Sequence, residues 1–282
     1  MEYVERPPHP ELAGLVRTYW WLRGEPDPDG VAEPALPDGS PELILNLGPP
    51  WEHVAADGTR TLQPSAFLVG QILGPMVVRP TGRMDLVAVR LEAHAASLLQ
   101  DDVSALTDSW APVESLRASA QPALAALRTE LSLESDLEAQ VLALDDAMRA
   151  LVEVSSPPDE LVGQAVRAIR GSHGAVEIDA LARTLDVTTR TLQRRFATAA
   201  GLSPKMLARI VRFQRVFAAW RDDPASCSRV ALECGYYDQS HLVRDFRDFA
   251  GAPPAGFLAA LPTFTAFFTA ARAAPRGAGA KA

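Results

Sequence analysis

The clearest pattern of apolar and polar positions is a pair of amphipathic segments in the C-terminal third of the chain. TLQRRFATAAGLSP (residues 191–204) and HLVRDFRDFAGAPP (residues 241–254) lie 50 residues apart and match in apolar, basic, glycine and proline positions. In each segment a leucine and a phenylalanine four residues apart, Leu192/Phe196 and Leu242/Phe246, mark one buried helical face. A unit that recurs at a fixed spacing indicates that one supersecondary structure is used twice.

Residues typical of helix ends set the boundaries around this repeat. Thr188 and Asp238 are suited to N-cap positions, and Gly201 and Gly251 to the left-handed position after a helix. Asp186 stands in a tight turn that favours the same left-handed conformation. The predicted helices cover residues 160–171, 178–185, 189–199, 204–221, 227–234, 239–250 and 254–261. We therefore predict an all-α domain with two helix-turn-helix units joined by a long helix.

The N-terminal half has a different pattern. Between residues 35 and 92, short apolar runs at 42–48, 66–71, 76–80 and 85–92 alternate with turns rich in Gly, Pro and Asp, which is typical of strands. An earlier apolar run, residues 15–22, places Trp20 and Trp21 on opposite faces if it is a strand. From residue 93 onward, helices are predicted at 94–100, 113–130 and 134–154. The fold class is thus an α+β domain, a small β-barrel or sandwich followed by helices, joined to the all-α domain.

These patterns divide the chain into four parts. Residues 1–154 form a sensor or interaction domain, β-rich over 1–92 and helical over 93–154. Residues 155–160, which contain Pro157 and Pro158, form a linker. Residues 161–261 form the domain with the two helix-turn-helix units, and residues 262–282 have the composition of a disordered tail. The helix at 134–154 has one apolar face, which either packs on its own domain or pairs with a second subunit.

Charge follows the same division. The net charge is −8 overall, but residues 1–158 hold 10 basic against 24 acidic residues, whereas residues 159–260 hold 14 against 11. An acidic body joined to a mildly basic module is consistent with a DNA-binding protein. No apolar run is long enough for a membrane span and the N-terminus lacks the pattern of a signal peptide, so we expect a cytoplasmic protein with no membrane contact. Cys227 and Cys234 are expected to be reduced and packed.

The second helix of a helix-turn-helix unit enters the major groove of DNA. Arg suits the O6/N7 edge of guanine and Gln the N6/N7 edge of adenine. The N-terminus of the long helix offers cations for phosphates, and Arg209 is a further phosphate candidate. We call the second helix of each unit its reading helix. Asp245 and Asp248 lie on the reading helix of the second unit, so we expect the reading helix of the first unit to supply most of the affinity for DNA. The predicted DNA-binding residues are Arg190, Gln193, Arg194, Lys205, Gln239, Ser240, His241 and Arg244.

The run from Gly235 to Pro254 resembles the DNA-binding domain of the AraC/XylS family of bacterial transcription regulators. It follows the family's G-[FY]-x-D-[QS]-S-[HY]-[FL]-x-R-x-F pattern and ends in G-x-x-P. The resemblance covers residues 160–261 and implies two helix-turn-helix units that read adjacent major-groove segments of double-stranded DNA. Asp186, where the family often has Gly, and Asp245, an acid on the second reading helix, depart from the family's pattern.

The N-terminal domain is similar, through residues 37–48, 70–76 and 87–99, to an uncharacterised domain fused to AraC-type modules, which implies a β-barrel-like sensor followed by helices. The candidate effector-pocket residues are Trp20, Asn46, Gln71 and Arg90, with Trp21 and Trp51 considered beside them. Besides DNA, the expected partners of the protein are a small-molecule effector, a second copy of the chain bound through the N-terminal domain, and RNA polymerase.

The same sequence leaves two other functions open. In the first, the protein is still a transcription regulator, but its N-terminal domain only mediates interactions and binds no ligand. An apolar cavity with inward polar groups would favour a ligand-binding sensor over such an interaction domain. The other is an enzyme with an attached DNA-binding module. The five histidines form no close pair and no cysteine precedes Cys227, so we expect no enzymatic activity, no catalytic residues, no metal and no cofactor.

Overall fold

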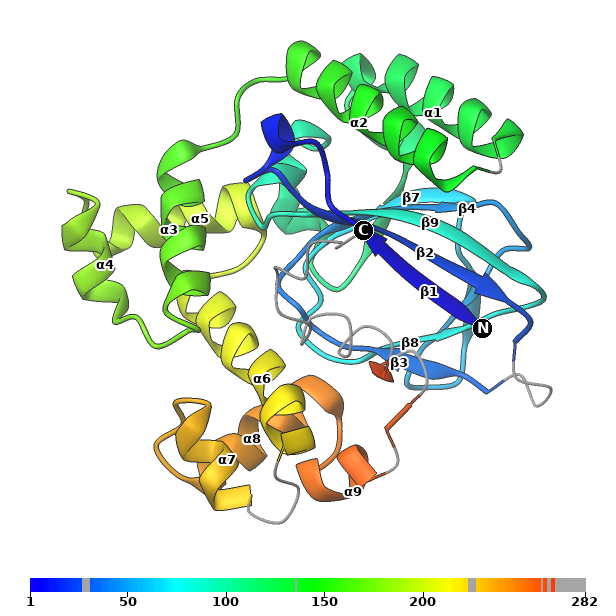
Figure 1. Ribbon diagram of the computed structural model, residues 1–282. Helices are drawn as coiled ribbons and strands as arrows, with labels where there is room; N and C mark the ends of the chain where they lie inside the picture. Colours follow the sequence, from blue (N-terminus) through cyan, green and yellow to red (C-terminus); the bar gives the residue numbers. More distant parts are fainter. Residues whose placement is uncertain (27–30, 135, 223–226, 260, 263–264, 267–282) are drawn as a thin grey trace, which may run out of the picture.

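The N-terminal domain is built from two antiparallel sheets that face each other (Figure 1). The computed structural model describes residues 1–26, 31–134, 136–222, 227–259, 261–262 and 265–266. The larger sheet has the order β1 (Glu2–Arg6), β2 (Val16–Gly24), β9 (Met84–Leu91), β4 (Glu42–Asn46), β7 (Ala66–Val69) and β10 (Trp110–Pro112). The smaller sheet has the order β3 (Glu33–Ala35), β8 (Met76–Arg79), β5 (Glu52–Val54) and β6 (Arg60–Leu62).

Strand alternation divides the apolar side chains of β2 between two cores. Trp20 packs with Leu22 and with Trp51 in the space between the sheets. Tyr19 and Trp21 point to the other face of the larger sheet, where helices cover it. The expected opposite orientation of the two tryptophans is therefore confirmed, and the side of each is fixed by the register of β2 against β9.

The segment after β9 is less helical than predicted. The helix expected at 94–100 is a short 3-10 turn, η2 (Ala95–Leu98), followed by η3 (Val103–Leu106). The helix expected at 113–130 begins later, as α1 (Gln121–Leu133), after η4 (Val113–Ser115) and η5 (Ala118–Ala120). The reason is that Trp110–Pro112 joins the edge of the larger sheet as β10, which the sequence pattern did not indicate. The first turn of α1 begins at Gln121 and has Pro122 as its second residue, where proline is tolerated because the first backbone N–H groups of a helix have no partner within the helix.

Helix α2 (Leu137–Val154) packs its apolar face on its own domain. Leu144, Met148 and Leu151 are buried in the core over the larger sheet. Two buried hydrogen bonds fix the helix to β2: Tyr19 Oη donates to Asp145 Oδ1 at 2.8 Å, and Trp21 Nε1 donates to Gln140 Oε1 at 2.8 Å. Figure 1 shows α1 and α2 lying across this face of the sheet.

The C-terminal domain matches the predicted helices to within a residue or two at almost every boundary. It consists of α3 (Glu160–Gly171), α4 (Ile178–Thr184), α5 (Thr189–Ala200), α6 (Pro204–Asp222), α7 (Cys227–Glu233), α8 (Gln239–Ala250) and α9 (Pro254–Ala259). Asp186, Gly201 and Gly251 have positive φ angles of 54°, 72° and 73°, as their positions require. Thr188 and Asp238 cap α5 and α8 through their side chains. One apolar core is shared by both units.

No helix within the described ranges is long and apolar enough to cross a membrane. The predicted tail, residues 262–282, falls almost entirely outside the described residues. Of its described residues, Thr265 is buried, and its hydroxyl donates to the carbonyl oxygen of Pro34 at 3.2 Å.

Candidate functional site

The first reading helix, α5, presents the predicted polar face to solvent. Arg190, Gln193 and Arg194 are exposed, while Leu192 and Phe196 are fully buried on the opposite face. Arg195, the other arginine of α5, makes two hydrogen bonds to Asp159 at 2.6 and 2.7 Å and so ties α5 to the first turn of α3. In the described part of the chain no such ion pair is found for Arg190 or Arg194, so both guanidinium groups are available to DNA.

The second reading helix, α8, exposes Gln239, Ser240 and Arg244. Gln239 Oε1 accepts a hydrogen bond from Ser228 Oγ at 2.8 Å, which orients its amide from α7. His241 is half-buried, and its ring packs edge-on against Tyr236 with the ring centroids 5.1 Å apart. The exposed polar residues of α8 are thus Gln239, Ser240 and Arg244, whereas the His241 ring is partly covered by Tyr236.

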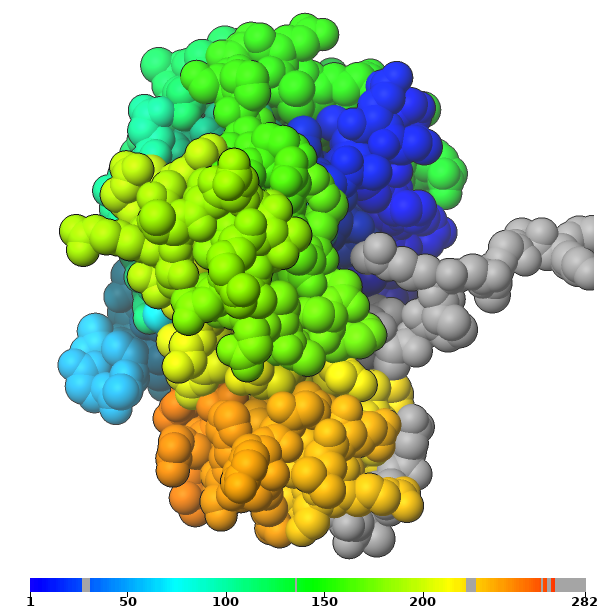
Figure 2. Space-filling model, turned by 90° about the vertical axis from the view of Figure 1, so that its left-hand side faces the viewer, coloured from blue at the N-terminus to red at the C-terminus, as the bar shows by residue number. Residues whose placement is uncertain are grey.

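Lys205 is exposed in the first turn of α6, the helix between the two units. The space-filling view shows both units on one face of the molecule: residues of α4 and α5, in yellow-green, lie above those of α7 and α8, in orange (Figure 2). The yellow of α6 appears between them. This placement suits contacts with successive parts of one DNA duplex.

Asp245 does not face DNA, contrary to the expectation drawn from the sequence. Its residue is only 1% exposed, and its Oδ1 accepts hydrogen bonds from Arg209 Nε at 3.0 Å and Nη2 at 2.7 Å. Arg209 also contacts Asp248 at 2.6 Å, so it is a structural residue that joins α6 to α8 rather than a free phosphate ligand. Burial would lower the pKa of Arg209, but these two carboxylates raise it above its ordinary value. The reason for expecting a weaker second reader therefore disappears.

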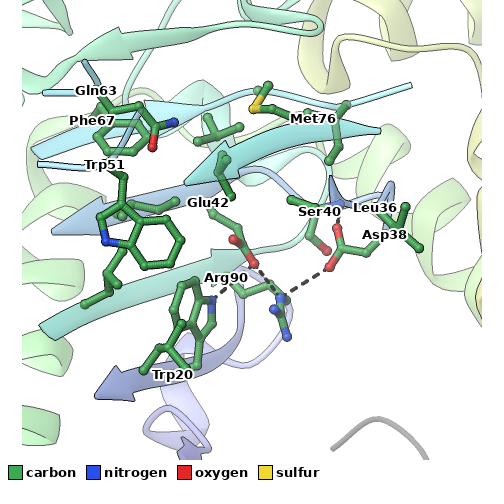
Figure 3. Close-up of a pocket in the computed structure, with 18 of the residues that line it drawn as sticks. Trp20, Leu36, Asp38, Ser40, Glu42, Trp51, Gln63, Phe67, Met76 and Arg90 are labelled. Carbon is green, nitrogen blue, oxygen red and sulfur yellow. Dashed lines mark hydrogen bonds and ion pairs between the residues drawn. The ribbon is translucent and has the colours of Figure 1, made fainter. Parts of the chain in front are cut away.

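A cavity of about 120 Å³ lies between the two sheets of the N-terminal domain (Figure 3). Its walls are mainly apolar and include Trp20, Trp51, Phe67 and Met76. Polar groups from Asp38, Ser40, Glu42, Gln63, Arg90, Gln214 and Thr265 also reach the wall. This is the apolar cavity with inward polar groups that a small-molecule site requires.

Arg90 is the electrostatic centre of this cavity. Its side chain is 3% exposed and meets three carboxylates: Glu42 at 2.6 Å, Glu5 at 3.0 Å and Asp38 at 3.3 Å. Trp20 Nε1 donates to the same Glu42 oxygen at 3.2 Å. Burial would lower the pKa of Arg90, but the surrounding acids, Glu42 foremost, raise it well above its ordinary value, so the group stays charged.

Of the four candidate pocket residues, the structure brings Trp20 and Arg90 together in the cavity, with Trp51 beside them. Asn46 lies elsewhere: its amide donates to Pro49 O at 2.7 Å and accepts from Gly48 N at 3.0 Å, so it closes the turn after β4. Gln71 is buried but does not line the cavity. Trp21 belongs to the core under α2.

No pattern in the sequence indicates that Asp38 and Glu42 line a cavity. Asp38 is in a turn, where its Oδ1 accepts from Ser40 N at 2.8 Å, a role that any turn aspartate fills. Glu42 begins β4 and looks like a polar residue at a strand end. Only the pairing of β4 with β9, which places Glu42 opposite Arg90, shows their common role.

The loop from Pro37 to Ser40 joins the cavity to the DNA-binding domain. Its Asp38 side chain reaches Arg90, and its backbone is held by the DNA-binding domain: Gln214 of α6 donates to Pro37 O, and Arg170 of α3 donates to Gly39 O at 2.7 Å. Gly39 has a φ of +72°, and a Cβ there would stand 2.5 Å from a methyl carbon of Leu207 on α6. Close packing of α6 on this loop therefore depends on glycine.

A second contact holds the ends of both reading helices. We define the docking loops as residues 71–75 and 107–109. Thr107 Oγ1 donates to the carbonyl oxygen of Gly201, which ends α5, at 2.7 Å. Pro75 packs against Gly251, which ends α8; its Cγ is 3.5 Å from the position of a Cβ there. Asp108 Oδ1 accepts from Leu73 N at 2.6 Å and links the two loops.

The C-terminal domain is thus defined by two capped helix-turn-helix units that share one core, with an exposed arginine on each reading helix. Residues 181–260 match a family model described as a helix-turn-helix domain, and residues 4–112 match one described as a domain of unknown function (DUF6597). The protein carries an AraC-type helix-turn-helix domain behind an uncharacterised N-terminal domain, as the sequence predicted, and it is a DNA-binding regulator.

Among solved structures, the chain is similar to ToxT from Vibrio cholerae. A crystal structure of ToxT from strain O395 has 9% identity and a TM-score of 0.46, covering 82% of this chain and 93% of ToxT. Apo ToxT K231A has 9% identity and a TM-score of 0.48, covering 91% and 100%. A ToxT structure with bound unsaturated fatty acid has 11% identity and a TM-score of 0.45, covering 80% and 89%. A comparison with curated proteins gave no significant match.

Proposed function

We propose that the chain is a transcription regulator that reads two adjacent major-groove segments and is controlled by a small ligand in the cavity of its N-terminal domain. The observation that carries this proposal is that the cavity wall and the domain contacts share residues. Asp38 and Ser40 lie in the loop that α3 and α6 contact, and Ile72 lies in a docking loop. A ligand that displaces these wall residues would also change how the reading helices are held.

In this proposal, the N-terminal domain sets the relative position of the two readers. The docking loops contact α5 and α8 at equivalent positions, 50 residues apart, and Asp108 makes the two loops one unit. Reading two segments about 34 Å apart requires the two helices to be held at a fixed spacing. Arg190, Gln193, Arg194, Gln239, Ser240 and Arg244 would contact base edges or phosphates, and Lys205 phosphates.

Thr107→Val is expected to weaken binding to a full site by about 2- to 10-fold, the effect of losing one hydrogen bond that holds α5. Binding to a half site read by one unit is expected to stay unchanged. Fluorescence anisotropy with full-site and half-site duplexes, identified from genomic DNA selected by the purified chain, measures both. Ser104→Ala, on the neighbouring 3-10 turn, is the control, because the bond to Asp102 is the one that the Ser104 hydroxyl makes among the described residues. Equal losses on both duplexes would contradict a positioning role.

Val78→Phe is expected to fill the cavity and to abolish the response of DNA binding to ligands. The control lies next to it on β8: Val77 does not line the cavity, because strand alternation turns it to the other face. Thermal shift with a panel of small aromatic and aliphatic compounds, followed by anisotropy with the active ones, tests this. Ligand affinity should fall at least about tenfold in Val78→Phe and stay unchanged in Val77→Phe. If the active compounds bind Val78→Phe and Val77→Phe equally well, their binding site lies outside the cavity.

The alternative, an N-terminal domain that only mediates contacts, is less favoured because the described residues leave a cavity of about 120 Å³ between the sheets. We propose a second copy of the chain and RNA polymerase as further partners, and we propose no enzymatic activity. Leu142, on the outer face of α2, is 63% exposed and is the natural point to test for self-association.

A further inference from the structure

The connecting turn of the second helix-turn-helix unit is longer than that of the first. In the first unit, Asp186 is the left-handed residue, with a φ of 54°, and Thr188 caps α5, so Val187 alone stands between them. In the second unit, the left-handed residue is Gly235, with a φ of 82°, and the N-cap of α8 is Asp238. Two residues stand between these positions, so the second turn carries an additional side chain.

The backbone hydrogen bonds identify the additional residue as Tyr237. Val187 N donates to Ala182 O at 3.0 Å, and Tyr236 N donates to Ala231 O at 2.9 Å. These two bonds close the same kind of turn at the end of the first helix of each unit. Tyr236 therefore corresponds to Val187, and Tyr237 has no counterpart in the first unit.

The two neighbouring tyrosines differ in burial. Tyr236 is 3% exposed and packs against the ring of His241, with the guanidinium of Arg212 over its own ring. Tyr237 is 87% exposed, and its side chain makes no hydrogen bond or ring contact within the described part of the chain. A single exposed apolar residue is ordinary on a protein surface, so exposure alone assigns no role to Tyr237. Its position in the unit does.

Tyr237 comes directly before the N-cap of the second reading helix. Gln239 and Ser240, which follow it in the first turn of α8, are exposed. In a helix-turn-helix unit the first helix crosses the phosphate backbone of DNA and the second lies in the major groove. The chain that connects them therefore passes the phosphates at the edge of the groove. A longer turn at this point places one more side chain beside them.

The chemistry of tyrosine suits a phosphate contact. Tyrosine hydroxyls are among the groups that bind phosphate oxygens in protein–DNA complexes, and such contacts fix how a reading helix lies in the groove. The neighbouring carboxylate of Asp238 is engaged, because its Oδ1 accepts from His241 N at 2.7 Å at the N-terminus of α8, where the helix dipole compensates negative charge. A neutral hydroxyl releases no counterion, so its contact does not add to the salt dependence of binding.

We infer that Tyr237 is a DNA-positioning residue which the second unit has and the first lacks, and that its hydroxyl donates a hydrogen bond to a backbone phosphate at the edge of the second major-groove segment. This inference rests on the proposed reading of two adjacent segments and adds a contact that holds α8 in its groove. At the corresponding place in the first unit, Val187 is half-buried against the domain core and offers no donor from its side chain.

Tyr237→Phe is expected to weaken binding to the full site by about 3- to 10-fold, the effect of one lost hydrogen bond to a charged group, with an unchanged salt slope. Fluorescence anisotropy at several salt concentrations, with the full-site duplex and with each half site, measures both quantities. The loss should occur on the half site that Arg244→Ala weakens and be absent on the other half site.

Tyr236→Phe is the matched control. It removes the same hydroxyl from the adjacent residue, whose Oη is buried without a hydrogen-bond partner among the described residues, and should bind DNA like wild type. Ethylation interference on the full site then identifies the phosphate. One phosphate whose ethylation weakens the wild-type complex should have no effect on the Tyr237→Phe complex, a change that a general loss of folding does not produce.

The outcomes separate this inference from the proposed function. If Tyr237→Phe binds like wild type while Arg244→Ala is weakened, the inference falls and the reading of two segments stands. A loss in Tyr237→Ala with none in Tyr237→Phe would also overturn it, because the ring rather than the hydroxyl would then make the contact. A wild-type chain that binds the full site no more tightly than either half site would count against the proposed function itself. Because Tyr237 is exposed, the melting temperature of Tyr237→Phe is expected to equal that of wild type.

Discussion

Replacing Arg194 or Arg244 by alanine is expected to weaken specific DNA binding by roughly 1–3 kcal/mol, or about 5- to 150-fold, and by similar amounts for the two residues. The two arginines occupy equivalent positions on α5 and α8, and both are exposed. The two variants would lose different amounts of DNA affinity if the Asp245 carboxylate faced DNA on α8 and repelled its phosphates. Its carboxylate is instead buried against Arg209, so it does not reduce the positive potential at that surface.

The measurement is genome-wide mapping of bound DNA for each variant, together with the salt dependence of binding to one selected site. An arginine that contacts a base relaxes sequence preference at the corresponding positions. One that contacts phosphate weakens all sites alike and lowers the salt slope by about one. Arg128→Ala removes the same charge from an exposed site on α1 and serves as the control for net charge. A large loss for Arg194→Ala with none for Arg244→Ala would contradict two equivalent readers.

Replacing Arg209 by methionine is expected to lower the free energy of unfolding of the chain by about 3 kcal/mol, because it leaves the Asp245 carboxylate buried without its partner. Asp245 joins α8 to α6, so the loss should fall on the second helix-turn-helix unit. Urea denaturation followed by circular dichroism measures the change, and hydrogen exchange shows whether α8 opens first.

Arg195→Met is the matched control for that prediction. Arg195 makes the same two-bond contact with a carboxylate, that of Asp159, but its side chain is 38% exposed, compared with 22% for Arg209, and Asp159 is 21% exposed, compared with 2% for Asp245. Solvent screens such pairs, so a loss of at most about 1 kcal/mol is expected. Replacing both members of the buried pair, Arg209→Met with Asp245→Leu, should restore much of the stability. Equal losses for the two single variants would show that burial of Asp245 is not the cause.

The helical domain was predictable because its signals are local. Each reading helix carries its apolar pair, its N-cap and its terminal glycine within about 15 residues, and the repeat shows the whole pattern twice. The exposed faces followed directly from the helical period, so the exposure of Arg190, Gln193, Arg194 and Arg244 was predictable. The role of Asp245 was not found, because its partner Arg209 lies 36 residues away on another helix.

The N-terminal domain was predictable in class but not in detail. Its long strands carry enough apolar residues to be recognised, whereas β3, β5, β6 and β10 have three residues each and owe their conformation to pairing with distant strands. The candidate pocket residues show the same limit. Amides in apolar runs look alike in a sequence, yet Asn46 closes its own turn, and Gln71 does not line the cavity that Trp20 and Arg90 line.

By itself, the sequence determined that the protein has two helix-turn-helix readers and which side chains they expose, because helix periodicity and capping act over a few residues. The tertiary structure decided where a ligand is expected to bind and how the two domains are joined. The acidic surroundings of Arg90, the loop that connects Asp38 to α3 and α6, and the docking of Thr107 on Gly201 all bring together residues that are far apart in the chain. Such contacts depend on strand register and domain packing, which no local pattern encodes.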